Sequence, residues 1–260
     1  MVDIAGLEIE NLIAFGLILL RMFGCIMFNP ILGRNNIPST VKIGFSMLLA
    51  MLVYVHHDVS YIKTIDTAVE YIIVGGKEFL IGFAIGTVVS FFAYVIILGG
   101  EVMDMQIGLA MSKIYDPGSN VSMSLSSTYL NIIFMFMFFY TNGHVTLIKL
   151  FLELEKTLPY GSVIFGKELA QGMIGVFCEC TVLGLKLAMP VIGLQFLMEM
   201  GVGILMKNIP QINVIMINIQ AKILVGLIFL VIIYPPAIAF LEGMLEKMFD
   251  SIEDMVVLMR

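Results

Sequence analysis

Residues 79–100 read FLIGFAIGTVVSFFAYVIILGG, an apolar run of 22 residues without a charged side chain. A helix needs roughly 20 mostly apolar residues to cross the hydrocarbon core of a bilayer, so this run predicts a membrane-spanning helix. Six stretches, the one around this run included, qualify or nearly qualify by the same measure. They lie at residues 11–32, 41–57, 69–100, 129–150, 172–206 and 214–241.

The composition of the whole chain excludes a water-soluble globule. Of its 260 residues, 60% are hydrophobic and 13% are charged, and the mean hydropathy is +1.01. A typical soluble domain has about 25% charged residues. We therefore predict an all-α integral membrane protein with about six hydrophobic, partly broken helical segments. The net charge of −6, with basic residues scattered singly, also excludes nucleic acid as a partner.

Several charges fall inside the apolar segments. They are Arg21, Lys77, Glu78, Glu179, Lys186 and Glu199. A charge at bilayer depth costs several kcal/mol unless it faces protein or a watery space, so these helices are expected to pack against neighbours. Gly82 and Gly86 have the small-xxx-small spacing that lets two helix backbones approach closely.

A polar stretch at residues 101–128 separates two apolar segments and contains the turn former Asp116-Pro117-Gly118. Glu101 and Asp104 lie on one face of any helix that continues past residue 100. A buried pair of this kind would suit a proton relay. We favour the other interpretation, a solvated helix end.

The C-terminal residues form a separate amphipathic pattern. Glu242, Glu246, Asp250 and Asp254 recur every four residues, opposite apolar side chains. We predict a membrane-embedded domain over 1–242 and an amphipathic helix over 243–260. Because an anionic leaflet repels its acidic face, docking on a partner protein or plain solvation is expected rather than binding to lipid.

Motifs for catalysis are missing from the sequence. There is no GxGxxG, P-loop or GxSxG pattern, and none of the three histidines has a second ligand one helical turn away. The pair Cys178 and Cys180 diverges on a helix, so packed free thiols are expected rather than a metal site. We predict no enzyme activity, no cofactor and no bound metal.

Three stretches, in order, resemble one family. The first is RMFGCIMFNPILGRNNIPSTVKIGFSMLLA (21–50), the second is EFLIGFAIG (78–86) with GGEVMDMQIGLAMSKIYDP (99–117), and the third is MGVGILMKNIPQINVIMINIQAK (200–222). Together they resemble the FliR family of flagellar biosynthetic proteins, which includes a counterpart in virulence injectisomes. The resemblance extends over residues 10–242.

The resemblance implies a non-enzymatic subunit of the flagellar type III export gate in the bacterial cell membrane, at the flagellar basal body. Family members assemble with P-type and Q-type subunits into a helical spiral of tilted hairpins. B-type and A-type export-apparatus proteins are the further partners, unfolded flagellar proteins are the cargo, and membrane lipid surrounds the complex.

The resemblance also assigns roles to residues. The plug-like loop that helps to close the pore corresponds to Gly108, Leu109, Ala110, Met111, Ser112, Tyr115, Asp116, Pro117 and Gly118. The structural motif positions correspond to Arg21, Pro30, Gly33, Pro38, Glu101, Asp104, Gln106, Pro210, Gln211 and Asn213. The residues themselves suit this assignment, because glycine, serine and methionine allow a closure that bends and yields.

Two other classes remain as alternatives. A small-molecule secondary transporter would build a midplane substrate site from Glu179, Lys186 or Glu199. A copper permease would use some of the 21 methionines as thioether ligands. The sequence alone does not distinguish a flagellar system from an injectisome.

Overall fold

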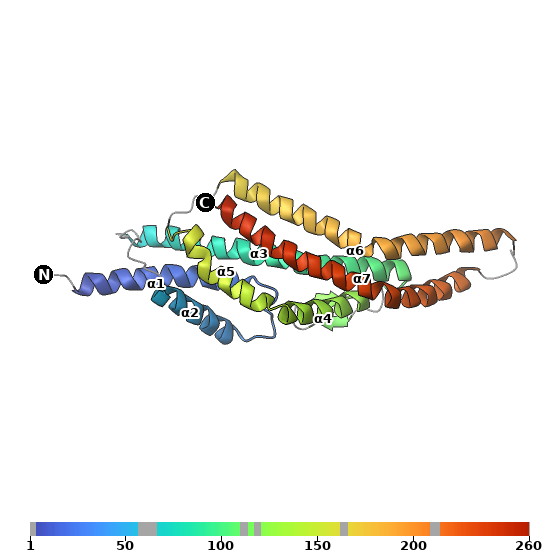
Figure 1. The fold of residues 1–260 in the computed structure, drawn as a ribbon, viewed down its shortest axis with the longest axis horizontal. Coiled ribbons are helices and arrows are strands. Elements are labelled where there is room, and N and C mark those ends of the chain that lie inside the picture. The colour runs from blue at the N-terminus through green and yellow to red at the C-terminus, as the bar shows by residue number, and fades with distance from the viewer. Residues whose placement is uncertain are drawn as a thin grey trace. The chain divides into compact units, whose positions relative to one another are not determined.

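The computed structural model describes residues 4–56, 67–109, 114–116, 121–161, 166–208 and 214–259 (Figure 1). Within these ranges the regular elements are helices apart from one short pair of strands. The elements are α1 (Ile4–Met27), α2 (Ser39–His56), α3 (Ala68–Ile107), β1 (Ile114–Asp116), β2 (Val121–Met123), α4 (Leu125–Tyr140), α5 (Gly143–Thr157), α6 (Lys167–Asn208) and α7 (Val214–Leu258).

The helices confirm the predicted all-α membrane protein. In the described part of the chain, α2, α3, α6 and α7 are long and apolar enough to cross a membrane. The pair α4 and α5 adds a fifth span if it is counted as one, although it is bent by 65°. The first apolar segment, expected over residues 11–32, is shorter: the apolar part of α1 covers Asn11–Met27. The strand pair was not predicted.

The chain forms two compact units. The first unit contains Met1–Phe91, Asn142–Phe177 and Lys247–Arg260, and the second contains Phe92–Thr141 and Cys178–Glu246. Helices α3, α6 and α7 each contribute residues to both units.

In the first unit, α1 and α3 pack with their backbones in contact. A β-carbon on Gly82 would lie 2.6 Å from the backbone nitrogen of Cys25, and one on Gly86 would lie 3.0 Å from Cβ of Phe28. The expectation that Gly82 and Gly86 serve a close helix crossing is confirmed. Larger residues at these positions would force the two helices apart.

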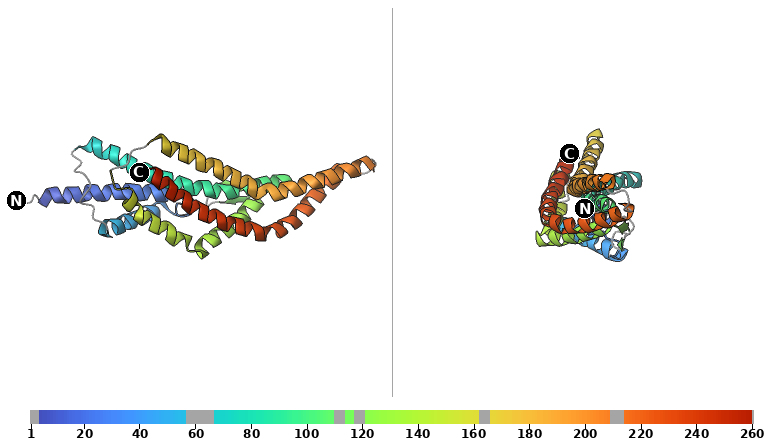
Figure 2. Two further views of the ribbon diagram at one scale, coloured as in Figure 1. Left: turned by 45° about the horizontal axis from the view of Figure 1, so that its top comes forward. Right: turned by 90° about the vertical axis from the view of Figure 1, so that its right-hand side faces the viewer.

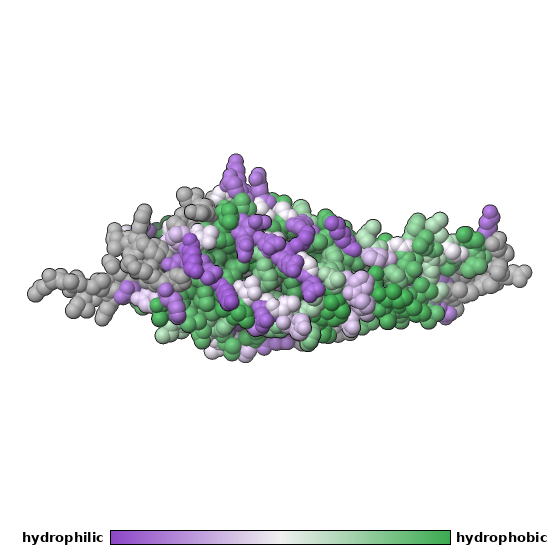
Figure 3. All heavy atoms as spheres, in the orientation of Figure 1, coloured by the Kyte–Doolittle hydropathy of each residue, from purple (hydrophilic) through white to green (hydrophobic). Residues whose placement is uncertain are grey.

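The last turns of α7 belong to the first unit and pack within it. The apolar side chains of Met248, Ile252 and Met255 are fully buried or nearly so. The predicted acidic stripe is exposed, and Figure 3 shows hydrophilic side chains, in purple, over this part of α7. The acids of this part of α7 thus lie on the exposed face, and the apolar face is covered from within the chain. Helix α7 continues through residue 242 without a break, and the division into domains there stays a prediction.

In the second unit, α6 and α7 form a hairpin whose two arms lie side by side (Figures 1 and 2). Gln195 Nε2 donates a hydrogen bond of 3.3 Å to the carbonyl oxygen of Lys222, and the Lys222 ammonium pairs with Glu199. The surface of the arms is mostly apolar, and Figure 3 shows mostly hydrophobic side chains, in green, over them. Of the most apolar stretch of 18 residues in α7, 17% is buried within the chain. This surface suits contact with lipid or with other apolar helices.

The charges inside apolar segments differ in their surroundings. Arg21 and Glu78 are buried as a pair, and Glu199 pairs with Lys222. Glu179 and Lys186 are exposed on α6. The prediction that such charges pack against protein is confirmed for the first pair. Of the cysteines, Cys25 and Cys180 are buried as expected, whereas Cys178 is exposed.

Candidate functional site

The expected pore-closing loop begins where α3 ends, at Gly108. This residue has φ +93°, a backbone conformation that side-chain-bearing residues rarely adopt. The amides of Gly108 and Leu109 both donate to the carbonyl oxygen of Asp104, at 3.0 and 2.8 Å. This is the bonding of a helix terminated by a glycine in a left-handed conformation. The chain therefore leaves the helix in one defined direction.

The carboxylate of Asp104 holds the start of α4. One of its oxygens accepts the backbone N–H of Ser126 at 2.9 Å, and the other accepts the hydroxyl of the same serine. Asp104 is fully buried. A carboxylate at a helix N-terminus satisfies amides that have no partner within the helix and interacts favourably with the helix dipole.

The solvated helix end favoured from the sequence is therefore wrong for Asp104. Glu101 and Gln106, on the same helix, are half-buried. Sequence spacing placed the two acids on one face, but it gave no sign that the start of α4 returns to that face.

Three serines and a glycine complete the attachment. Ser124 is the N-cap of α4 and accepts the amide of Ser127 at 3.3 Å. The Ser127 hydroxyl donates to the carbonyl oxygen of Ile97 at 2.9 Å, and a β-carbon on Gly100 would lie 2.5 Å from Cα of Ser127. We call Gly100, Asp104, Ser124, Ser126 and Ser127 the clamped neck, because they hold the end of α3 against the start of α4.

Between the two arms of the neck the loop forms an antiparallel hairpin. Strand β1 pairs with β2 in the register Ile114↔Met123, Tyr115↔Ser122 and Asp116↔Val121. Met123, next to the neck, is 2% exposed. The described part of the loop is therefore a short paired stem on a fixed base.

Only some of the predicted loop residues can be located. Gly108 and Leu109 lie at the neck, and Tyr115 and Asp116 belong to β1. Ala110, Met111, Ser112, Pro117 and Gly118 fall outside the described residues. Pro210, Gln211 and Asn213 of the third motif also fall outside them.

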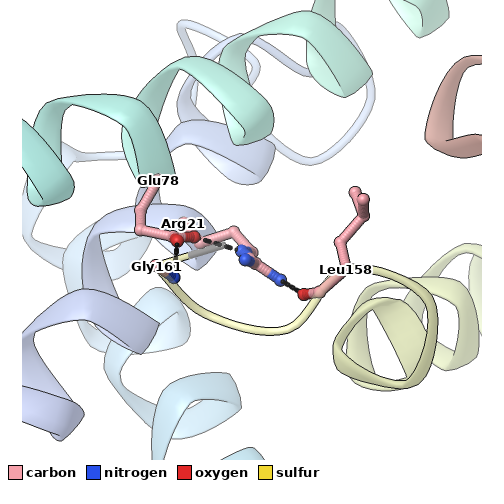
Figure 4. A network of polar contacts seen from close by, with 4 residues as sticks. All are labelled: Arg21, Glu78, Leu158 and Gly161. Atoms are coloured by element: carbon pink, nitrogen blue, oxygen red, sulfur yellow. Dashed lines mark hydrogen bonds and ion pairs between the residues drawn. The ribbon is translucent and has the colours of Figure 1, made fainter. Parts of the chain in front are cut away.

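Arg21 is the centre of a buried network in the first unit (Figure 4). Its Nε donates to Glu78 at 2.6 Å, its Nη1 donates to the carbonyl oxygen of Leu158 at 2.7 Å, and its guanidinium lies 3.9 Å from the ring centroid of Tyr160. Glu78 also accepts the amide of Gly161 at 2.8 Å. The network ties α1, α3 and the turn after α5 together, which supports the structural role expected of Arg21.

The remaining motif residues build the turn between α1 and α2. A β-carbon on Gly33 would lie 2.6 Å from the carbonyl oxygen of Asn29, so only glycine fits there. The carbonyl oxygen of Gly33 accepts the Lys42 ammonium at 2.8 Å, and that of Pro38 accepts the Val41 amide at 2.9 Å as α2 begins. Pro30 is half-buried in the same turn. These positions shape the backbone and present no reactive group.

The partners in both networks were not predicted from the sequence. Ser124 followed by Ser127 before an apolar run is a recognisable helix start, so the N-cap could have been found. The contacts of Asp104 with Ser126 and of Arg21 with Leu158 join residues that are 22 and 137 positions apart, and no local pattern reports them. Among the described residues no group of three His, Cys, Asp or Glu side chains could hold a metal ion.

Comparison with known proteins places this sequence in a family. Residues 12–248 match the family described as bacterial export proteins, family 1. The flagellar biosynthetic protein FliR of Escherichia coli (strain K12) is 24% identical over 92% of this chain and 90% of its own length. The proteins of the same name from Bacillus subtilis (strain 168) and Aquifex aeolicus (strain VF5) are 23% and 27% identical. Those matches span 84% and 87% of this chain, and 85% and 87% of the relatives' lengths. Because the family match covers most of its length, this chain belongs to bacterial export proteins, family 1, which are membrane proteins of an export apparatus and not enzymes.

Proposed function

We propose that the chain is a subunit of the flagellar type III protein export gate. It forms part of the conduit that passes unfolded flagellar proteins across the cell membrane, and it helps to close that conduit. The observation that carries the proposal is the family match over residues 12–248, in which the relatives are named flagellar biosynthetic proteins.

The geometry of the second unit supports the closing role. The loop leaves a helix whose end is set by Gly108, and it returns to a helix whose start is held by Asp104. A seal must occupy a defined position when the conduit is empty and must yield when a chain passes. A hairpin on the clamped neck meets the first need, and its glycine, serine and methionine residues meet the second.

The exposed apolar helices support an assembled state. Exposed apolar side chains on α7 include Leu224, Ile228 and Val231, and α6 exposes Glu179 and Lys186 beside apolar residues. Charges at such positions are stable when other protein or water covers them. We propose the P-type and Q-type gate subunits as the neighbours in the membrane, with the B-type and A-type proteins as further partners.

The secondary-transporter alternative has less support. Its expected site residues do not form a buried group in the described part of the chain, since Glu179 and Lys186 are exposed and Glu199 pairs with Lys222. Pro210, Gln211 and Asn213 are proposed as structural, with proline ending a helix and the amides satisfying freed backbone groups. Replacing Pro210 by Ala should then reduce assembly of the gate; normal assembly with abolished export would contradict this role.

The test of function uses cells that make this protein. Removing the whole chain should abolish export of flagellar subunits, and cells that still build flagella would refute the proposal. Deleting 109–121 should leave the chain assembled but make the membrane leaky to small solutes. A Gly/Ser segment of equal length is the matched variant, because it restores length without the hairpin.

The leak should disappear when another gate subunit is also removed, since an unassembled chain encloses no conduit. Unchanged permeability with normal assembly would refute the closing role and leave the export role standing.

A further inference from the structure

A groove lies between α5 and the last turns of α7, in the first unit. It has a volume of about 450 Å³, within the range of pockets that bind ligands or side chains of a partner. Its floor is apolar, with Leu154 3% exposed and Val256 6% exposed. Its edges carry Lys149, Glu153 and Glu253.

The apolar lining is not fully covered by the chain. Val257 is 63% exposed, and Leu150 and Phe249 are half-buried. The neighbouring side chains Met248, Ile252 and Met255 are buried and hold this part of α7 within the unit. The open side therefore offers apolar anchoring sites next to a fixed helix pair, which is the arrangement that receives an amphipathic helix.

The charge on the α7 side of the groove favours one kind of occupant, whereas on the α5 side the basic Lys149 offsets Glu153. Residues 242–259 contain five acids and one lysine, and Glu246, Asp250, Glu253 and Asp254 are exposed. Such a density of charge is too costly for the hydrocarbon region, so this part of α7 lies in water. An anionic lipid surface is repelled by it. A basic surface is attracted, because opposite charges at the rim steer and orient a partner.

We propose that the groove between α5 and α7 docks a basic amphipathic helix of a partner protein. Apolar side chains one turn apart enter over Leu154 and Val256, and lysine or arginine side chains on the flank meet Glu253 and the exposed Glu246 and Asp250 beside it. The proposal concerns a binding surface and does not depend on the closing role of the loop.

The test measures peptide binding to the full chain in nanodiscs of zwitterionic lipid. Two fluorescent synthetic peptides share one leucine spacing, and one carries lysines on its flank where the other carries glutamates. The lysine peptide should bind, the glutamate peptide should not, and empty nanodiscs should bind neither. Raising the salt concentration should weaken the binding, since rim charges are screened.

Three single variants locate the site. Glu253→Lys should weaken binding of the lysine peptide about tenfold, and Val257→Ser should weaken it about fivefold. Glu242→Lys is the matched control, because it makes the same charge change on an exposed residue of α7 outside the groove, and it should bind as the unmodified chain does. All three positions are exposed, so the fold should persist, and unchanged particle mass would verify this.

A charge swap separates docking from indirect effects. The glutamate peptide should bind Glu253→Lys more tightly than it binds the unmodified chain. Four outcomes would overturn the proposal: equal binding of both peptides, equal loss in Glu242→Lys, binding to empty nanodiscs, or self-association of the chain that Val257→Ser abolishes. The last two would assign the groove to lipid or to a second copy of the chain.

Discussion

The Arg21 network of the first unit and the clamped neck of the second unit both bury a charged group completely. They differ in what surrounds the charge. Arg21 is paired with the opposite charge of Glu78, whereas the contacts that hold Asp104 are the amide and the hydroxyl of Ser126. Separating the first pair leaves two buried ions, which is costly. Opening the neck to water costs only hydrogen bonds that water can replace. A buried charge that has a charged partner therefore resists separation more strongly than a buried charge held by neutral donors.

The largest expected effect comes from breaking the buried ion pair of Arg21 and Glu78. Arg21→Met removes one partner of a buried ion pair and leaves Glu78 charged and uncompensated. We expect a loss of about 3–5 kcal/mol in the free energy of unfolding. Thermal unfolding in detergent and the amount of chain in the membrane measure the loss.

The double variant Arg21→Met with Glu78→Leu controls for the cause. Replacing both members of a buried pair by apolar residues is often close to neutral, so most of the stability should return. A double variant as unstable as the single one would show that the charge pairing does not cause the effect.

A smaller effect is expected at the neck. Ser126→Ala deletes the hydroxyl bonded to Asp104 and keeps the backbone bond, for a local loss of about 1.5–3 kcal/mol. The chain should stay abundant in the membrane, and solute leakage should rise because the base of the hairpin loosens. Ser122→Ala, at an exposed position of β2, is the matched control. Equal leakage from both variants would contradict the role of Ser126 in holding the base of the hairpin.

At the end of α3, Gly108→Ala tests the conformation rather than a contact. Among the described residues only Ile223 comes within 4.0 Å of an added β-carbon, but the φ of +93° strains any other residue. We expect destabilisation by about 1–2 kcal/mol. Gly44→Ala, in open space on α2, should instead stabilise the chain by up to about 1 kcal/mol. Unfolding measurements that give both changes the same sign would refute this explanation.

The smallest effect is expected from an exposed ion pair. Lys156 and Glu153 are 2.9 Å apart, with 62% and 64% of their side chains exposed. Exposed pairs contribute little, so Lys156→Ala should change stability by less than about 0.5 kcal/mol. A loss close to that of Arg21→Met would mean that burial does not distinguish the two pairs.

The helices could be predicted because the signal for them is local. Six apolar stretches correspond to the described helices, with α4 and α5 forming one bent pair, since hydropathy and length are read from neighbouring residues. The close approach at Gly82 was also predictable, because small residues at this spacing have one main use in membrane helices.

The site was less predictable because it depends on distant contacts. The strands of the hairpin have three residues each, too short for an alternating pattern to stand out. Asp104 looked solvated because its partner Ser126 follows on another helix. Similarly, the presence of Arg21 in an apolar segment predicted burial, but not its partners Glu78, Leu158 and Tyr160.

The most direct test of membership in the export gate is the native mass and composition of the particle that contains this chain. The chain would be extracted from its own cells in a mild detergent and analysed by native mass spectrometry. The account predicts one large particle with several copies of two other small hydrophobic proteins. A stable, monodisperse single chain or small homodimer would contradict it and favour the transporter.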